Sequence, residues 1–341
     1  MKNKYELYLI KEFLDRYELK KDAFKTPHNE FRFLCYKFSF IIDHFIIPDI
    51  QKESLFEAVI VEFRNFPHLN FIIRNTILKL GKKWAFTVIC GKENKQMMIS
   101  ICEQISKKIK IIVLPYNNLT QGQYSELLTT ANFWNLLKGD KILIYQEDTI
   151  IFVNNIIDFL DYDYIGAPFL KNSNDTPNCV GNGGLSLRTR QKMLEVINRA
   201  KLSDLVINSS TRRYMQYRRL DKAPEDIYFS KNLQELGLGK VAPYDIASLF
   251  ASECVFNPNC WGGHKIWIGT KKWKGFIKAK FGFNYYKFDS NLNDYLTFLN
   301  KPLQFNKTKE IKNAFDIDLY FYAHINNIHL TSYKEVISHI S

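Results

Sequence analysis

Two adjacent carboxylates follow a β-prone segment in the stretch KILIYQEDTIIF, residues 141–152. Apolar residues lie on both sides of its polar centre, Gln146-Glu147-Asp148-Thr149. A carboxylate at the end of a buried strand costs free energy unless a positive group meets it. Divalent cations prefer oxygen ligands, so Asp148 is a candidate metal ligand, whereas Glu147 could simply face solvent.

Two short motifs downstream carry groups that often serve ligands. The run GNGG, residues 181–184, lets the backbone approach a bound molecule closely, because glycine has no Cβ. The run PED places Glu225 and Asp226 at the expected start of a helix, where acidic residues are favoured. Each motif also has an ordinary explanation, as a loop or as a helix start, and a single histidine such as His264 is usually structural or exposed.

The elements that must position these groups alternate between strands and helices. The patterns predict strands within residues 55–63, 84–91, 109–115 and 141–146, and helices within 67–81, 94–108 and 120–139. This alternation predicts an α/β fold with a mainly parallel, doubly wound, Rossmann-like sheet. Ligands of such sheets lie beyond the carboxyl ends of the strands. Glu62 and Arg64 follow the first strand there, as Gln146, Glu147 and Asp148 follow the fourth.

The remaining segments are less regular. After residue 154 we expect a helical turn and a short strand ending at 166–168, then a loop through GNGG, a strand at 185–187 and two helices. Four arginines, at positions 212, 213, 218 and 219, could contact phosphate as a lid or form a basic surface loop. We expect a helical N-terminal extension (1–52), a main domain (53–268) and a basic, aromatic C-terminal extension (269–341) packed on it.

Composition narrows the class of protein. A net charge of +12 over 341 residues suggests an anionic partner, such as a nucleotide, a phosphorylated acceptor, nucleic acid or an acidic membrane surface. Six cysteines without framework spacing favour a reducing compartment. Cys254, Cys260 and His264 lack the CxxC pair and the fourth ligand of a structural zinc site. With no signal peptide or membrane span evident, we expect a soluble cytoplasmic protein, with peripheral membrane contact left open.

The order of the motifs resembles a known family. The sequence carries LIYQEDT (143–149), DYIGAP (163–168), GNGGLSLR (181–188), EDIYFS (225–230) and then His264, besides Glu62, Arg64, Phe133-Trp134 and Glu253. These runs are similar to those of a domain-of-unknown-function family of glycosyltransferase type, within the nucleotide-diphospho-sugar-binding fold called GT-A. The resemblance covers about residues 55–268 and extends, more distantly, to the β-1,4-galactosyltransferases. Gln146 replaces the first aspartate of the GT-A Asp-x-Asp motif, which leaves metal dependence open.

The resemblance implies transfer of a sugar from a nucleotide-diphosphate sugar, with a UDP-sugar favoured, to a hydroxyl of a glycan or glycoprotein acceptor. It implies Mn²⁺ or Mg²⁺ bound by Asp148, with His264 as a second ligand. A nitrogen ligand would favour Mn²⁺.

Roles for the remaining residues follow from that chemistry. Asp226 is the first candidate for the general base that takes the acceptor proton, which implies inversion. Glu225 would bind acceptor or donor hydroxyls, although the two carboxylates could exchange roles. Asn182, beside Gly183 and Gly184, could hydrogen-bond a sugar hydroxyl. Glu62 and Arg64, together with Gln146 and Glu147, lie where the nucleotide would dock.

Two other functions are compatible with parts of the pattern. A nucleotidyltransferase or nuclease could hold two metals on Asp148 and Asp226 and bind nucleic acid through its positive charge. That hypothesis leaves GNGGLSLR unexplained, and we do not expect a nucleic-acid partner. A catalytically inactive carbohydrate-binding scaffold would account for Gln146.

Overall fold

The computed structural model describes residues 11–18, 25–43, 45–171 and 176–280. Contacts within the chain divide the described residues into two units, one made of those within 11–47, 66–74 and 274–280 and the other of those within 48–65 and 75–273. Because the described chain ends at residue 280, most of the predicted C-terminal extension (269–341) lies outside the described residues. The candidate site residues all belong to the second, larger unit.

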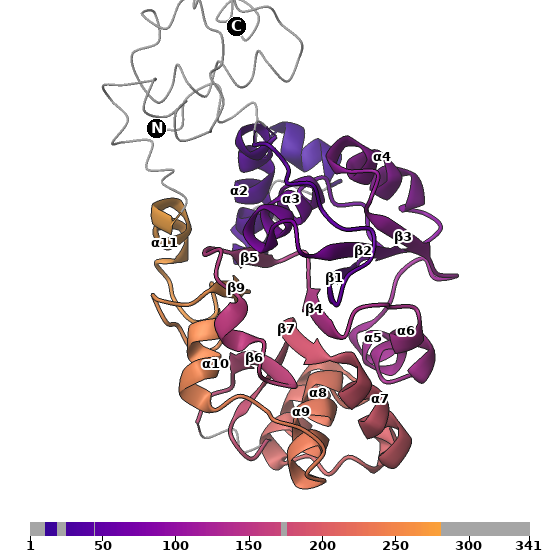
Figure 1. The fold of residues 1–341 in the computed structure, drawn as a ribbon. Coiled ribbons are helices and arrows are strands. Elements are labelled where there is room, and N and C mark those ends of the chain that lie inside the picture. The colour runs from indigo at the N-terminus through magenta and orange to yellow at the C-terminus, as the bar shows by residue number, and fades with distance from the viewer. Residues whose placement is uncertain (1–10, 19–24, 44, 172–175, 281–341) are drawn as a thin grey trace, which may run out of the picture. The chain divides into compact units, whose positions relative to one another are not determined.

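A six-stranded sheet forms the centre of the larger unit (Figure 1). Its strand order is β3-β2-β1-β4-β7-β6. The strands are β1 (Phe56–Val61), β2 (Ala85–Cys90), β3 (Lys110–Val113), β4 (Lys141–Tyr145), β6 (Tyr164–Pro168) and β7 (Val180–Thr189). Strands β1 to β4 pair in parallel, and only β7 runs antiparallel to its neighbours. The predicted α/β fold with a mainly parallel, Rossmann-like sheet is confirmed.

Helices cover the sheet through one shared apolar core. Residues of α5 (Gln121–Leu128), α6 (Ala131–Asn135), α7 (Arg190–Arg199) and α9 (Glu225–Glu235) join β1, β4 and β6 in one buried cluster. The helix α4 (Lys95–Ile105) packs on β2 and β3. The single helix predicted over 120–139 is two helices, because Thr130 caps the start of α6 by accepting a hydrogen bond from the Phe133 amide.

A second, three-stranded sheet explains why the apolar run resumes after Asp148. Its order is β5-β9-β8, with β5 (Thr149–Ile151), β9 (Gly262–His264) and β8 (Ala251–Ser252). The chain leaves the large sheet at Tyr145 and enters the small one at Thr149, which pairs with His264. Asn75 fixes the other edge of β5 through two hydrogen bonds with the backbone of Ile151. The QED segment is thus the link between two sheets.

The GNGG segment, predicted as a loop, lies inside strand β7, which is buried from residue 180 to residue 188. The register between β6 and β7 shifts beside this segment, between Gly166 and Ala167 and again before Pro168. The sequence pattern identified only residues 185–187 as strand, because glycine and asparagine are poor strand formers. Their presence in a buried strand indicates that other groups approach the backbone closely.

The other elements are short connections and helices. The larger unit contains η2 (Ile157–Phe159), η3 (Leu202–Asp204), α8 (Ser209–Arg218) and α10 (Tyr244–Phe250). The smaller unit contains α2 (Pro27–Ile42) and the first residues of α3 (Leu69–Leu80), where Phe38 packs on Phe71 and Arg74 pairs with Asp43 at 2.8 Å. Helix α11 (Trp273–Lys280) ends the described chain. None of the described helices is both long enough and apolar enough to cross a membrane.

Candidate active site

His264 lies between two carboxylates at the junction of the two sheets. Its Nδ1 is 2.8 Å from Glu253 Oε2, and its Nε2 is 3.0 Å from Asp148 Oδ1. Only 4% of either His264 or Asp148 is exposed. The positive group that the buried Asp148 requires is therefore this imidazole, supplied by strand β9, and not a residue close in sequence.

Charge at this junction shifts the pKa of each group. Burial alone would lower the pKa of His264, but Glu253 and Asp148 together raise it to about 9. Burial would raise the pKa of Asp148, but the positive charges of His264 and Lys265 hold it well below its ordinary value. The Asp148 carboxylate is thus ionised at neutral pH.

Lys265 completes the junction from an unusual backbone conformation. Its φ of +45° lies in the left-handed region, where a non-glycine residue costs about 1–2 kcal/mol. In that conformation the Lys265 amide donates to the Asp148 carbonyl at 3.1 Å, and Nζ lies 3.8 Å from Asp148 Oδ2. Strain of this kind is typical of functional sites.

Glu62, Arg64 and Glu147 form a second charged group beyond β1 and β4. Glu62 accepts two hydrogen bonds from the Arg64 side chain, at 2.8 and 2.7 Å, and also accepts from the backbone amides of residues 63 and 64. The same guanidinium lies 3.6 Å from Glu147 Oε1. Glu147 is buried rather than solvent-facing, and its carboxylate lies within 4.8 Å of that of Asp148.

Glu225 is held by a buried salt bridge. Both of its carboxylate oxygens accept hydrogen bonds from Arg188, at 2.6 and 3.1 Å, and the Arg188 side chain is fully buried. Removing one partner of such a pair leaves an uncompensated buried charge, at a cost of about 3–5 kcal/mol. The pairing with Arg188 therefore fixes Glu225 at the start of α9. Asp226 is then the carboxylate that faces the site.

Asp226 is placed by the glycine segment. Its Oδ2 accepts from the Gly183 amide at 3.1 Å and its Oδ1 from the Ile227 amide at 2.8 Å. Burial, and then the negative charge of Glu225, raise the pKa of Asp226 to about 7. A carboxylate with a pKa near neutrality is suited to general acid–base chemistry.

Two consecutive glycines of β7 pack against residues of the site. A Cβ on Gly183 would lie 2.7–2.8 Å from atoms of Glu225, Arg188 and Asp226. A Cβ on Gly184 would overlap the imidazole ring of His264. Asp226 therefore packs against Gly183 and His264 packs against Gly184. The Cα atoms of two neighbouring residues are about 3.8 Å apart.

Asn182, Gln146 and Tyr124 line the same region. The side-chain nitrogen of Asn182 donates hydrogen bonds to the carbonyls of Ala167 and Pro168 in β6. These bonds link β7 to β6. Gln146 is bound by its backbone to the Gly184 carbonyl at 3.0 Å. Burial and the charge of Glu225 raise the pKa of Tyr124 far above its ordinary value, so its hydroxyl stays protonated beside the site.

The donor set fits a divalent cation. His264 Nε2 makes no hydrogen bond within the described part of the chain, although Asp148 Oδ1 lies only 3.0 Å away. Glu253 fixes Nδ1, the arrangement typical of metal-binding histidines. The imidazole thus faces Glu253 and Asp148, and among the described residues it forms no metal-type cluster with Cys254 and Cys260.

Part of the larger unit matches a known protein family. Residues 108–264 match the family described as "Protein of unknown function (DUF5672)". No curated protein matches the chain. Among solved structures, the crystal structure of HddC from Yersinia pseudotuberculosis is similar over 41% of this chain and 79% of that chain, with 12% identity and a TM-score of 0.30.

Replacing Gly184 with alanine tests whether the glycine makes room for His264. We expect Gly184→Ala to lose about 1–3 kcal/mol of unfolding free energy, because the new methyl group must displace the His264 ring in a packed site. Urea denaturation measures this loss. Gly275→Ala, where a Cβ meets nothing within 4 Å, is the matched control and should cost nothing; equal effects of the two changes would contradict the packing described.

The raised pKa of Asp226 predicts a pH-dependent stability. Between its ordinary value of 3.8 and about 7, Asp226 keeps its proton in the folded chain and loses it in the unfolded chain. Folding then binds a proton, so the stability of the wild type falls, relative to Asp226→Asn, as pH rises from about 4 to about 7, and is level above that. Denaturation of both proteins over this range gives the difference. A difference independent of pH would show that the pKa is not raised.

Proposed function

We propose that this protein is a metal-dependent glycosyltransferase, which moves a sugar from a nucleotide-diphosphate sugar to a hydroxyl of an acceptor. One observation carries the proposal: Gly184 lies against His264, which pairs with Asp148, while the amide of the adjacent Gly183 donates to the base candidate Asp226. Sugar transfer needs both parts, a site for the diphosphate and a base for the acceptor, close together.

Asp148 and His264 would hold the cation, with Glu253 fixing the imidazole. The chemistry that Mn²⁺ or Mg²⁺ supplies when bound is neutralisation of the charge that builds on a departing diphosphate. The imidazole nitrogen favours Mn²⁺. The backbone amide of Gln146 donates a hydrogen bond to the Gly184 carbonyl. The side chain at position 146 takes no part in this bond, so the proposal does not require an aspartate there.

Asp226 would act on the acceptor. As the acceptor oxygen forms its bond to the anomeric carbon, the bond from that carbon to the diphosphate oxygen breaks, and the hydroxyl proton passes to the Asp226 carboxylate. Direct displacement of this kind inverts the anomeric centre. Glu225 positions Asp226 through its bidentate pairing with Arg188, and its negative charge contributes to the raised pKa of Asp226.

The nucleotide would lie beyond β1, beside Glu62 and Arg64. Arg64 keeps part of its surface exposed although Glu62 holds it, so it can present its guanidinium to a ribose, base or phosphate. We propose a UDP-sugar as the donor and a glycan or glycoprotein as the acceptor.

Changing Asp148 tests this proposal. In the presence of Mn²⁺ or Mg²⁺, a panel of UDP-, GDP- and CMP-sugars should yield released nucleotide with the wild type, and we expect Asp148→Asn to reduce that release at least a hundredfold. Isothermal titration calorimetry with Mn²⁺ alone should show binding to the wild type and none to the variant, because a ligand and its charge are lost.

Asp204→Asn, at an exposed carboxylate, is the control and should behave as wild type. If the protein binds metal but turns over none of the donors, the inactive scaffold is favoured. If it turns over no donor and binds an oligonucleotide in a salt-sensitive manner, the nucleic-acid enzyme is favoured. Either outcome would overturn the proposal.

A further inference from the structure

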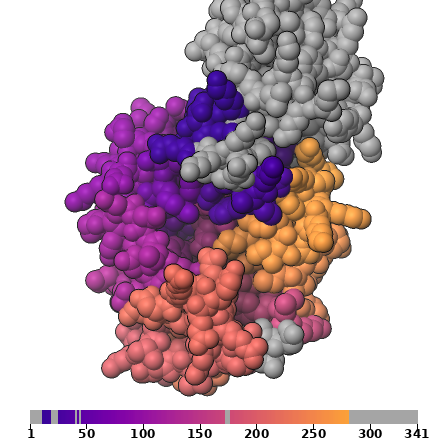
Figure 2. Space-filling model, turned by 180° about the vertical axis from the view of Figure 1, so that it is seen from behind, coloured from indigo at the N-terminus to yellow at the C-terminus, as the bar shows by residue number. Residues whose placement is uncertain are grey.

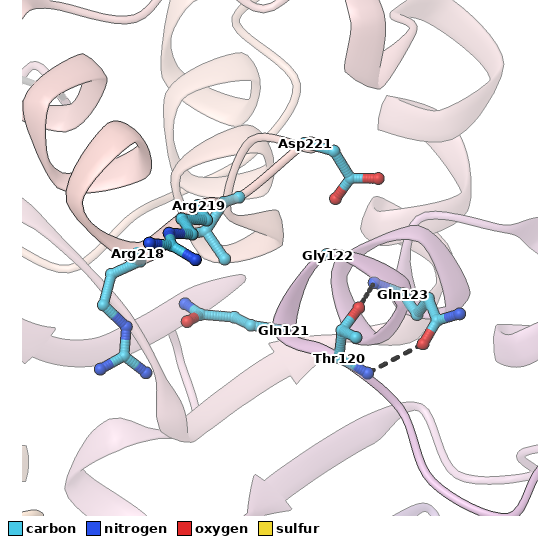
Figure 3. A pocket seen from close by; sticks show the side chains of 8 residues that line it. Thr120, Gln121, Gly122, Gln123, Arg218, Arg219 and Asp221 are labelled. Carbon is cyan, nitrogen blue, oxygen red and sulfur yellow. Dashed lines mark hydrogen bonds between the residues drawn. The ribbon is translucent and has the colours of Figure 1, made fainter.

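A pocket of about 510 Å³ lies between the first turn of α5 and the chain segment that follows α8. Arg218 and Arg219 form one wall, and Gln121 extends toward them (Figure 3). Asp221, the one carboxylate of the lining, lies on the other side, against Gly122. The basic residues predicted as a lid or a surface loop are thus part of helix α8 and its end.

The arginines of this region have no carboxylate partner among the described residues. Arg212, Arg213, Arg218 and Arg219 form none of the salt bridges there, whereas the nearby Lys222 pairs with Glu126 at 3.7 Å. Helix α8 itself contains no acidic residue. Arg219 adopts a left-handed conformation, with φ of +53°, where glycine or asparagine is preferred. Arg219, with a strained backbone, therefore forms part of the pocket wall.

The pocket adjoins the candidate active site through α5. Ser125 of α5 accepts a hydrogen bond from the Glu225 amide at 3.3 Å, directly before Asp226. Tyr214 of α8 accepts a hydrogen bond from the Gln121 side chain at 3.1 Å and donates one to it at 3.4 Å. Helix α8 is therefore bound to the same first turn of α5 that lines the pocket.

Aromatic surface accompanies the charge on α8. Tyr217 is 84% exposed and Tyr214 is 44% exposed, and Thr211 is the one buried residue of the helix. Figure 2 shows the coral-coloured segment that includes α8 at the surface of the molecule. An exposed aromatic ring offers an apolar face to a sugar ring, and a guanidinium pairs with phosphate or carboxylate.

We infer that this pocket binds an anionic group, phosphate or carboxylate, on the sugar acceptor. The inference rests on the proposed function, because it places the acceptor beside Asp226. Residues 221–225 connect the pocket lining to Asp226 along the chain, and α5 contributes both to the lining and to the contact with Glu225, whereas the nucleotide is placed at Glu62 and Arg64 beyond β1. The substrate class is therefore an acidic glycan, with Arg218 and Arg219 as specificity-determining residues.

Binding of small anionic sugars tests the inference without any turnover. Mannose 6-phosphate, glucuronic acid and mannose are titrated against the full chain by calorimetry. We expect at least one of the two anionic sugars to bind at least tenfold more tightly than mannose, with the better of them identifying the charged group, and Arg218→Gln/Arg219→Gln to abolish that difference. Hydrogen bonds to charged groups contribute enough to each contact for a loss of this size.

Matched variants separate a pocket from general positive charge. Arg212→Gln/Arg213→Gln removes the same charge from the same helix outside the pocket lining and should leave binding unchanged, whereas Asp221→Asn should tighten it. Equal losses for the two arginine pairs, no preference for either anionic sugar over mannose, or tighter binding of a single-stranded oligonucleotide would overturn the inference. If the wild type binds the anionic sugars as expected but turns over no nucleotide sugar, the proposed function is contradicted and the anion-binding pocket is not.

Discussion

The structure of the candidate site depends on one imidazole held between two buried carboxylates. His264 pairs with Glu253 on one side and faces Asp148 at 3.0 Å on the other. Burying two carboxylates without a positive group would cost several kcal/mol for each charge. The imidazole offsets that cost and presents Nε2 beside a carboxylate oxygen, so one arrangement both stabilises the fold here and provides ligands for a cation.

The surrounding backbone is arranged to keep this imidazole in place. Pairing of β5 with β9 sets Thr149 opposite His264, and Gly184 leaves the space that the ring occupies. Lys265, in its strained conformation, binds the Asp148 carbonyl. The glycines of β7 are therefore explained by what packs against them and not by flexibility, and the adjacent Gly183 links the same strand to Asp226.

The sequence predicted the sheet and the position of the acidic segment, because strand and helix periodicities are local properties. It did not predict that the apolar run after Asp148 enters a second sheet, since that depends on pairing with residues more than a hundred positions away. The roles of Arg188, Lys265 and Tyr124 were missed for the same reason. Arg188 offered one signal, as the one charged residue of a strand that is buried from residue 180 to residue 188. The loop predicted at GNGG was wrong because glycine's weak strand preference was outweighed by tertiary packing.

Anomalous diffraction from crystals soaked with Mn²⁺ tests the central claim most directly, because it locates the cation without reference to substrate or turnover. The arrangement of His264 between Glu253 and Asp148 predicts a manganese peak within bonding distance of Asp148 and His264 Nε2, with Nδ1 still bound to Glu253. A peak at another place, or no peak while the imidazole remains paired with both carboxylates, would show that the site is a structural salt bridge and would contradict the account.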